Sequence, residues 1–125
     1  MAITACDGLR DVLAPLKGYD LNLFEEMGLP AALVRKLATA GITEPTPIQT
    51  HAIPHALNGF DVLGLAQTGT GKTMAFGLPL ITALMEAPGK PAPKTIRSLI
   101  LAPTRELASQ IRDALLPLVK DSPIK

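Results

Sequence analysis

Apolar positions along the chain predict an alternation of short helices and buried strands. Helical spacing of apolar residues, together with proline and glycine at the segment ends, predicts helices over 30–41, 47–57, 72–85 and 103–117. Within the second of these, Pro54 predicts a bend. Two mostly apolar segments, 61–66 and 98–102, predict strands that are buried on both faces.

The order of these elements predicts the fold class. A strand, a helix and a second strand favour a parallel sheet with helices on its faces, which is an α/β fold. Because both strands are mostly apolar, we expect further strands beside them. Residues 1–20 stand apart, since their apolar positions run into Pro15 and Gly18. This leader is either a short amphipathic helix or a partly disordered segment.

Composition excludes several classes of protein. The 125 residues are 47% apolar and 18% charged, which excludes a disordered tail. A single cysteine, Cys6, excludes a disulfide scaffold and a cysteine-based zinc site. No signal peptide and no apolar run of membrane-spanning length is visible, so we expect a soluble, cytoplasmic protein. Residues 1–60 carry a net charge of −2 and residues 61–125 a net charge of +3, which weakly favours anion binding in the second half.

A glycine-rich segment between a predicted strand and a predicted helix is the strongest chemical signal. It consists of Ala66, Gln67, Thr68, Gly69, Thr70, Gly71, Lys72 and Thr73. Glycines let backbone N–H groups turn toward a phosphate, and the following helix adds its positive end. Lys72 would reach the outer phosphates of a nucleotide, and Thr73 would offer a hydroxyl to Mg²⁺. Ala66 departs from the strict pattern, which has glycine in first place.

Two flanking segments resemble motifs of one family, the DEAD-box RNA helicases. Residues 41–49 (Gly-Ile-Thr-Glu-Pro-Thr-Pro-Ile-Gln) resemble its Q motif, and Phe24 lies 17 residues before Gly41, where that family has an isolated aromatic. Residues 66–73 match its motif I, including alanine in first place, and residues 103–108 (Pro-Thr-Arg-Glu-Leu-Ala) match its motif Ia. The amino-acid sequence of these motifs is similar to that of bacterial members of the family. The resemblance implies a RecA-like P-loop NTPase fold, a three-layer sandwich around a parallel sheet.

The resemblance also implies a role for each matched residue. Gln49 would hydrogen-bond the adenine edge, Phe24 would stack on the adenine face, and Thr46 would tie the Q-motif loop to the phosphate loop. Residues 66–73 would bind ATP, with Mg²⁺ held through Thr73. The backbone of RNA would be contacted, without regard to base sequence, by Pro103, Thr104, Arg105 and Glu106.

The family's hydrolysis machinery has no match in this sequence. The acidic residues after Lys72 are Glu86, Glu106, Asp113 and Asp121, and no two are adjacent, so the Asp-Glu-Ala-Asp motif is missing. The resemblance therefore implies a leader (1–20), the N-terminal portion of the first RecA-like domain (21–125) and no second RecA-like domain. We expect an N-terminal fragment of an ATP-dependent helicase that binds ATP and by itself neither hydrolyses it nor unwinds RNA.

Other interpretations stay open at this stage. The chain could be a short non-catalytic nucleotide- or RNA-binding module that acts with a protein partner, whereas the Q motif and motif Ia disfavour another kind of P-loop ATPase. Taken alone, Phe24 is typical of a core aromatic, and Gln49 and Arg105 are typical of surface residues. His51 and His55 have a zinc-binding spacing, but no further ligand is nearby, so we expect no metal there.

Overall fold

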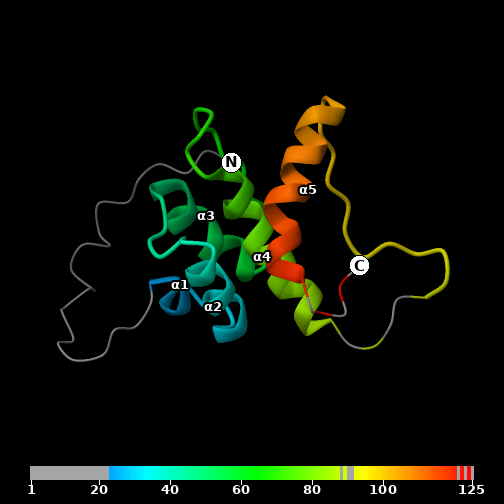
Figure 1. Ribbon diagram of the computed structural model, residues 1–125, viewed down its shortest axis with the longest axis horizontal. Coiled ribbons are helices and arrows are strands. Elements are labelled where there is room, and N and C mark those ends of the chain that lie inside the picture. The colour runs from blue at the N-terminus through cyan, green and yellow to red at the C-terminus, as the bar shows by residue number, and fades with distance from the viewer. Residues whose placement is uncertain (1–22, 88, 90–91, 121, 123, 125) are drawn as a thin grey trace.

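Regular structure in the chain is helical throughout the part that the computed structural model describes, residues 23–87, 89, 92–120, 122 and 124. Its helices are α1 (Leu23–Glu26), α2 (Ala31–Thr39), α3 (Pro47–Leu57), α4 (Lys72–Glu86) and α5 (Arg105–Val119). α4 lies between α3 and α5, and α1 and α2 close one end of the bundle (Figure 1). None of these described helices is long and apolar enough to cross a bilayer. The predicted leader, 1–20, lies outside the described residues.

Local signals set the ends of the predicted helices. Pro30 is the N-cap of α2, one position earlier than its predicted place as first helical residue. Gly41 ends this helix with a φ of 76°, and its N–H donates to Ala38 at 3.0 Å. Thr46 is the N-cap of α3 and Pro47 follows as its first residue, as predicted. α5 continues to Val119, slightly beyond its predicted end near Pro117.

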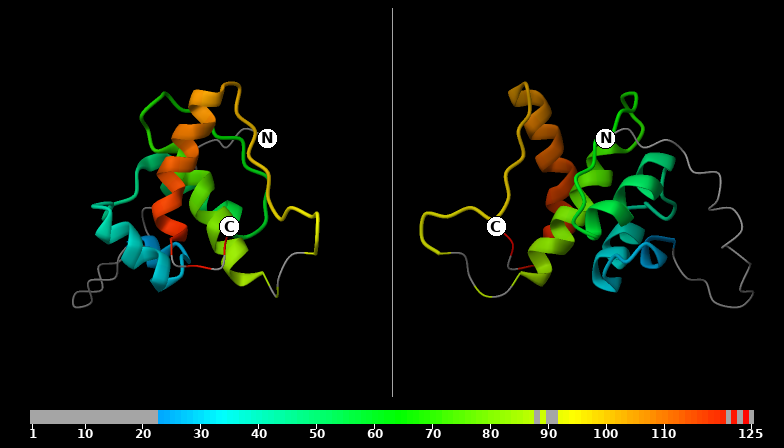
Figure 2. Two further views of the ribbon diagram at one scale, coloured as in Figure 1. Left: turned by 45° about the vertical axis from the view of Figure 1, so that its right-hand side comes forward. Right: turned by 180° about the vertical axis from the view of Figure 1, so that it is seen from behind.

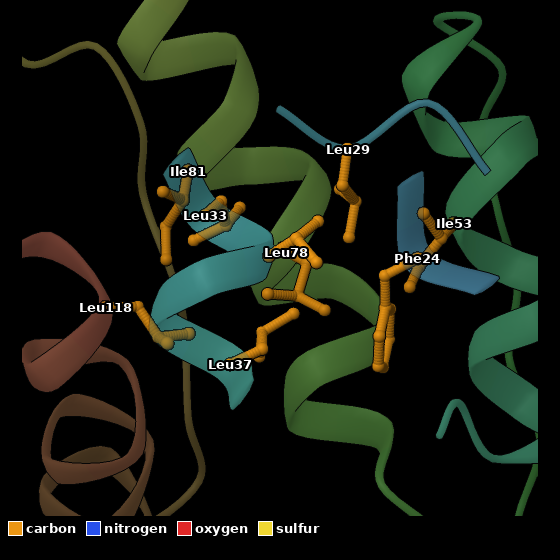
Figure 3. Packing of buried hydrophobic residues seen from close by; sticks show 9 residues of the cluster. Phe24, Leu29, Leu33, Leu37, Ile53, Leu78, Ile81 and Leu118 are labelled. Carbon is orange, nitrogen blue, oxygen red and sulfur yellow. The ribbon is translucent and has the colours of Figure 1, made fainter. Parts of the chain in front are cut away.

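The core gathers around Leu78 of α4, which is fully buried (Figure 3). Leu33 and Leu37 of α2 pack against it, and Leu118 of α5 belongs to the same cluster. Each such leucine contributes about 2 kcal/mol by leaving water. This cluster therefore joins the first helices of the chain to the last one, and it fixes where α5 lies.

The prediction of strands over 61–66 and 98–102 is wrong for this structure. Both segments are irregular, and no backbone hydrogen bond joins them to each other or to other described residues (Figure 2). Leu65 and Leu101 are 86% and 84% exposed instead of buried. A parallel strand exists only through hydrogen bonds to neighbouring strands.

Candidate functional site

The glycine-rich segment forms the turn that leads into α4. Gly69 and Gly71 have φ angles of 81° and 89°, in the left-handed region that favours glycine. Gly71 is the N-cap of α4, and Lys72 and Thr73 are its first two residues. The loop therefore stands at the positive end of a 15-residue helix, where anions are stabilised.

The Lys72 side chain folds back across this loop. Its ammonium group donates to the carbonyl of Gln67 at 3.0 Å and also to that of Ala66. The N–H groups of residues 68–71 donate no hydrogen bond to any described residue. The first turn of α4 contains no acidic side chain. The loop thus presents main-chain donors beside a lysine cation, which is the donor set that binds phosphate.

The start of α3 is in direct contact with the loop. Gln49 is 3% exposed, and its Oε1 accepts from the Thr46 N–H at 3.0 Å, while its Nε2 donates to the Gly71 carbonyl at 3.1 Å. A Cβ atom on Gly71 would lie 2.4 Å from Gln49 Nε2 and 2.9 Å from Thr46 Oγ1. The Thr46 hydroxyl oxygen is itself buried, with no hydrogen-bond partner in the described part of the chain. Residue 71 thus lies so close to Gln49 and Thr46 that only glycine fits at this position.

Phe24 lies in the core of the described residues. Its side chain is 0% exposed and belongs to the same cluster as Ile53 and Leu78 (Figure 3). This place agrees with the alternative that Phe24 is a core aromatic. Its stacking on adenine stays a prediction, and it would require the ring to become exposed when a nucleotide binds.

The start of α5 is an exposed helix end with a well-formed cap. The hydroxyl of Thr104 accepts from the Leu107 N–H at 3.2 Å, as an N-cap residue does. Residues 103–106 are all exposed. The views of Figures 1 and 2 agree that this end of α5 and the phosphate loop lie at the same end of the molecule. Two positive helix ends therefore face the same side.

An apolar cleft of about 330 Å³ lies between α3, α4 and α5, next to the start of α4. Its walls include Ile48, Ala52, Val62, Phe76, Leu107 and Ile111. Lys72 and Thr73, the first two residues of α4, also line the cleft. The cleft is therefore mostly apolar, and its polar side chains lie at the end that adjoins the glycine-rich loop.

Of the described acidic residues that follow Lys72, Glu86 lies far from the loop, Asp113 is paired and Glu106 is exposed in the first turn of α5. Glu86 ends α4, a 15-residue helix that begins at Lys72, so the two are about 21 Å apart along its axis. Asp113 accepts from the neighbouring Arg112 at 2.7 Å. His55 Nδ1 lies 2.8 Å from the His51 carbonyl. No group of three potential metal ligands occurs among the residues described.

The comparison with known families decides the identity. The DEAD/DEAH box helicase model matches residues 46–125. The chain belongs to this family. It is 54% identical over 91 residues to the ATP-dependent rRNA helicase rrp3 of Emericella nidulans. The aligned segment covers 73% of this chain and 18% of that relative. It is 47% identical over 101 residues to the ATP-dependent RNA helicase DeaD of Haemophilus influenzae, covering 81% of this chain and 16% of that relative.

Solved structures of DEAD-box proteins share the arrangement. The RNA helicase Prp28 of Chaetomium thermophilum bound to ADP matches with a TM-score of 0.69 and 42% identity, over 84% of this chain and 24% of that one. A DEAD box protein from Methanococcus jannaschii matches with a TM-score of 0.71 and 36% identity, over 82% and 27%. The described helices are thus arranged as in part of a RecA-like P-loop NTPase domain, although no strand of its sheet is formed among the described residues. This DEAD-box chain spans less than a fifth of the length of the curated relatives it matches.

These findings confirm the family and fold class that the motifs indicated. This is a member of the ATP-dependent DEAD-box RNA helicase family. The site that sequence reasoning assembled is partly brought together: Thr46, Gln49 and Gly71 are in contact and Lys72 closes the loop. Sequence reasoning did not find the contact between Gln49 and the Gly71 carbonyl, since no sequence signal reports that approach.

Proposed function

We propose that this DEAD-box chain binds ATP at the loop of residues 66–73 and contacts the backbone of RNA at residues 103–106. The observation that carries the proposal is the loop itself. Left-handed glycines turn it, main-chain N–H groups without described partners line it, and Lys72 lies across it. That one similar structure is bound to ADP supports a nucleotide as the ligand.

Thr46 and Gln49 hold the loop in the shape that binds phosphate. The bond from Gln49 to the Gly71 carbonyl fixes the N-cap of α4, and burial of the glutamine shields that bond from water. One amide hydrogen and one lone pair of Gln49 are not engaged by the bonds described above, which leaves them for the adenine edge. Adenine recognition is therefore proposed for Gln49, with Phe24 as the stacking residue, and nucleotide binding would have to expose both side chains, which are buried in this structure.

Thr73 is the residue proposed to hold Mg²⁺ together with the nucleotide. Its hydroxyl makes no hydrogen bond to the described residues and lies in the first turn of α4, beside Lys72. A hydroxyl oxygen is a suitable ligand for this hard cation. The metal would neutralise phosphate charge when bound, while the chain's own contribution is to place Lys72 and Thr73 at one helix end.

RNA binding is proposed at the exposed start of α5. Arg105 is the first residue of this helix, where a guanidinium group and main-chain N–H groups can share one phosphate. Such contacts carry no base information, so binding should not depend on sequence. The family's RNA helicase relatives support RNA as the nucleic acid.

These 125 residues alone are proposed to bind ATP without turning it over. Phosphoryl transfer requires acids that hold the metal and position the attacking water. Glu86 stands at the far end of α4 and Asp113 is paired with Arg112, while Glu106, exposed at the start of α5, has no second acidic residue beside it in the sequence. The chain would then act as the N-terminal portion of a first RecA-like domain (21–125), with the remaining helicase parts supplied by other residues or by a partner.

The test is a titration of the 125-residue chain with a fluorescent ATP analogue and Mg²⁺. Lys72→Ala should weaken binding at least about tenfold, since it removes a charge-assisted contact with phosphate. Lys94→Ala is the control, because it removes the same charge from an exposed loop. Equal affinity in the Lys72→Ala variant and the unaltered chain would refute the proposed nucleotide site.

A further inference from the structure

The two halves of α5 have different surroundings. Its first six residues, 105–110, are all exposed, whereas Ile111 and Leu118 in the following part are buried. Leu115 approaches α4 so closely that a Cβ atom on Gly77 would lie 2.4 Å from its Cδ2. α5 is therefore held at its C-terminal half, and its first turns project beyond the core (Figure 1).

The last carbonyl groups of α5 have assigned partners. The Leu116 carbonyl accepts from the Lys120 N–H at 3.1 Å, and the Val119 carbonyl accepts from Ser122. The Leu118 carbonyl accepts from Lys36 Nζ at 3.0 Å, and Lys36 also donates to the Lys120 carbonyl. The cation at this helix end thus comes from α2, more than eighty residues away, because the last turn of α5 has no basic residue of its own.

We propose that Lys36 is a positioning residue for the RNA-binding end of α5. Lys36 binds the C-terminal end of α5, and the exposed N-terminal end of this helix carries Arg105. A helix of 15 residues is about 22 Å long. A small rotation about its C-terminal end therefore displaces its N-terminal end much further than it displaces its last turn. The lysine therefore sets where Arg105 stands relative to the phosphate loop. This inference rests on the proposed function of residues 103–106.

Apolar packing and hydrogen bonds both act on the angle of α5. Leu118 and Ile111 contribute apolar contacts, which are not directional. The bonds from Lys36 to two main-chain carbonyls are directional, and they lie at the end of α5 opposite Arg105. Removing them should leave α5 helical and in place while its N-terminal end samples a wider range of positions.

The experiment compares single substitutions in the full 125-residue chain. Lys36→Met keeps the aliphatic stem and removes the bonds, Lys36→Arg keeps donors and charge, and Arg35→Met removes one charge from the exposed neighbouring position of the same helix. Binding of a labelled single-stranded RNA is measured by anisotropy, nucleotide binding by titration and folding by thermal melting followed by circular dichroism.

For Lys36→Met we expect RNA affinity to fall about three- to tenfold, with nucleotide affinity unchanged and Arg35→Met and Lys36→Arg close to the unaltered chain. Arg105→Gln should by itself lower RNA affinity about tenfold. In the double variant, Lys36→Met should add nothing to Arg105→Gln, because both act through one contact.

The remaining outcomes overturn the inference in distinguishable ways. If Arg105→Gln lowers RNA affinity while Lys36→Met matches Arg35→Met, the positioning role is wrong and the proposed RNA site stands. If the two effects add, Lys36 acts independently of Arg105. If Lys36→Met lowers melting temperature and both affinities together, the contact of Lys36 with α5 is only structural. If Arg105→Gln has no effect on RNA, the proposed RNA site fails, and the positioning role fails with it.

Discussion

Replacing Gly71 by alanine tests the contact between α3 and the phosphate loop. Two separate costs follow from the geometry. The residue has a φ of 89°, where an L-residue is strained by about 1–2 kcal/mol. Its added Cβ atom would lie 2.4 Å from Gln49 Nε2 and 2.9 Å from Thr46 Oγ1, so Gln49 must move.

The displacement of Gln49 has a cost of its own. The bond from its Nε2 to the Gly71 carbonyl would break, and an amide that is 3% exposed would lose its partner. A buried polar group without a partner costs about 1–3 kcal/mol. With the backbone strain, Gly71→Ala should disfavour the native loop by about 2–5 kcal/mol.

Gly69→Ala is the matched control for this substitution. Gly69 has a similar φ of 81°, but a Cβ atom there would meet no atom within 4 Å. Gly69→Ala should therefore carry the backbone strain alone. Titration with a fluorescent ATP analogue should show that Gly71→Ala weakens binding about five- to 150-fold more than Gly69→Ala does, which is the equivalent of the lost buried bond. Equal losses in the two variants would refute the argument that Gln49 and Thr46 support the loop.

Two further predictions concern stability. Leu118→Ala should lower the free energy of unfolding by about 2–4 kcal/mol, because Leu118 is 2% exposed in the core, whereas Leu116→Ala, at 58% exposed, should change it by less than about 0.5 kcal/mol. Urea denaturation measures both, and similar losses would contradict the assigned core. Thr104→Ala should cost about 1 kcal/mol by removing the acceptor for the Leu107 N–H, and Thr104→Ser should restore it. A stability of Thr104→Ala equal to that of the unaltered chain would show that this cap does not hold α5.

The helices were predictable from the sequence because their signals are local. The start of α3 is set by Thr46 and Pro47, and the end of α2 by Gly41. Each of these residues acts within one turn of the helix end that it sets. The phosphate loop was predictable for the same reason, since Gly69 and Gly71 form the turn and Lys72 follows directly. The amino-acid sequences of the motifs were enough to indicate the family, and the match over residues 46–125 confirms it.

The burial of side chains and the pairing of strands were not predictable in this way, because they depend on residues far away in the chain. The apolar runs at 61–66 and 98–102 have the composition of buried strands, yet a strand needs hydrogen-bonded neighbours that these two do not provide for each other. The place of Phe24 in the core is likewise decided by α3 and α4 packing around it.

The sequence by itself indicated the approximate ends of α2, α3, α4 and α5, the glycine-rich turn before α4 and the family to which the chain belongs. These properties follow from the conformational preferences of neighbouring residues. The tertiary structure alone decided that Gln49 supports Gly71 and that Lys36 caps α5. Each of these contacts joins residues that are distant along the chain, and only the packing of α2, α3, α4 and α5 brings them within hydrogen-bond distance.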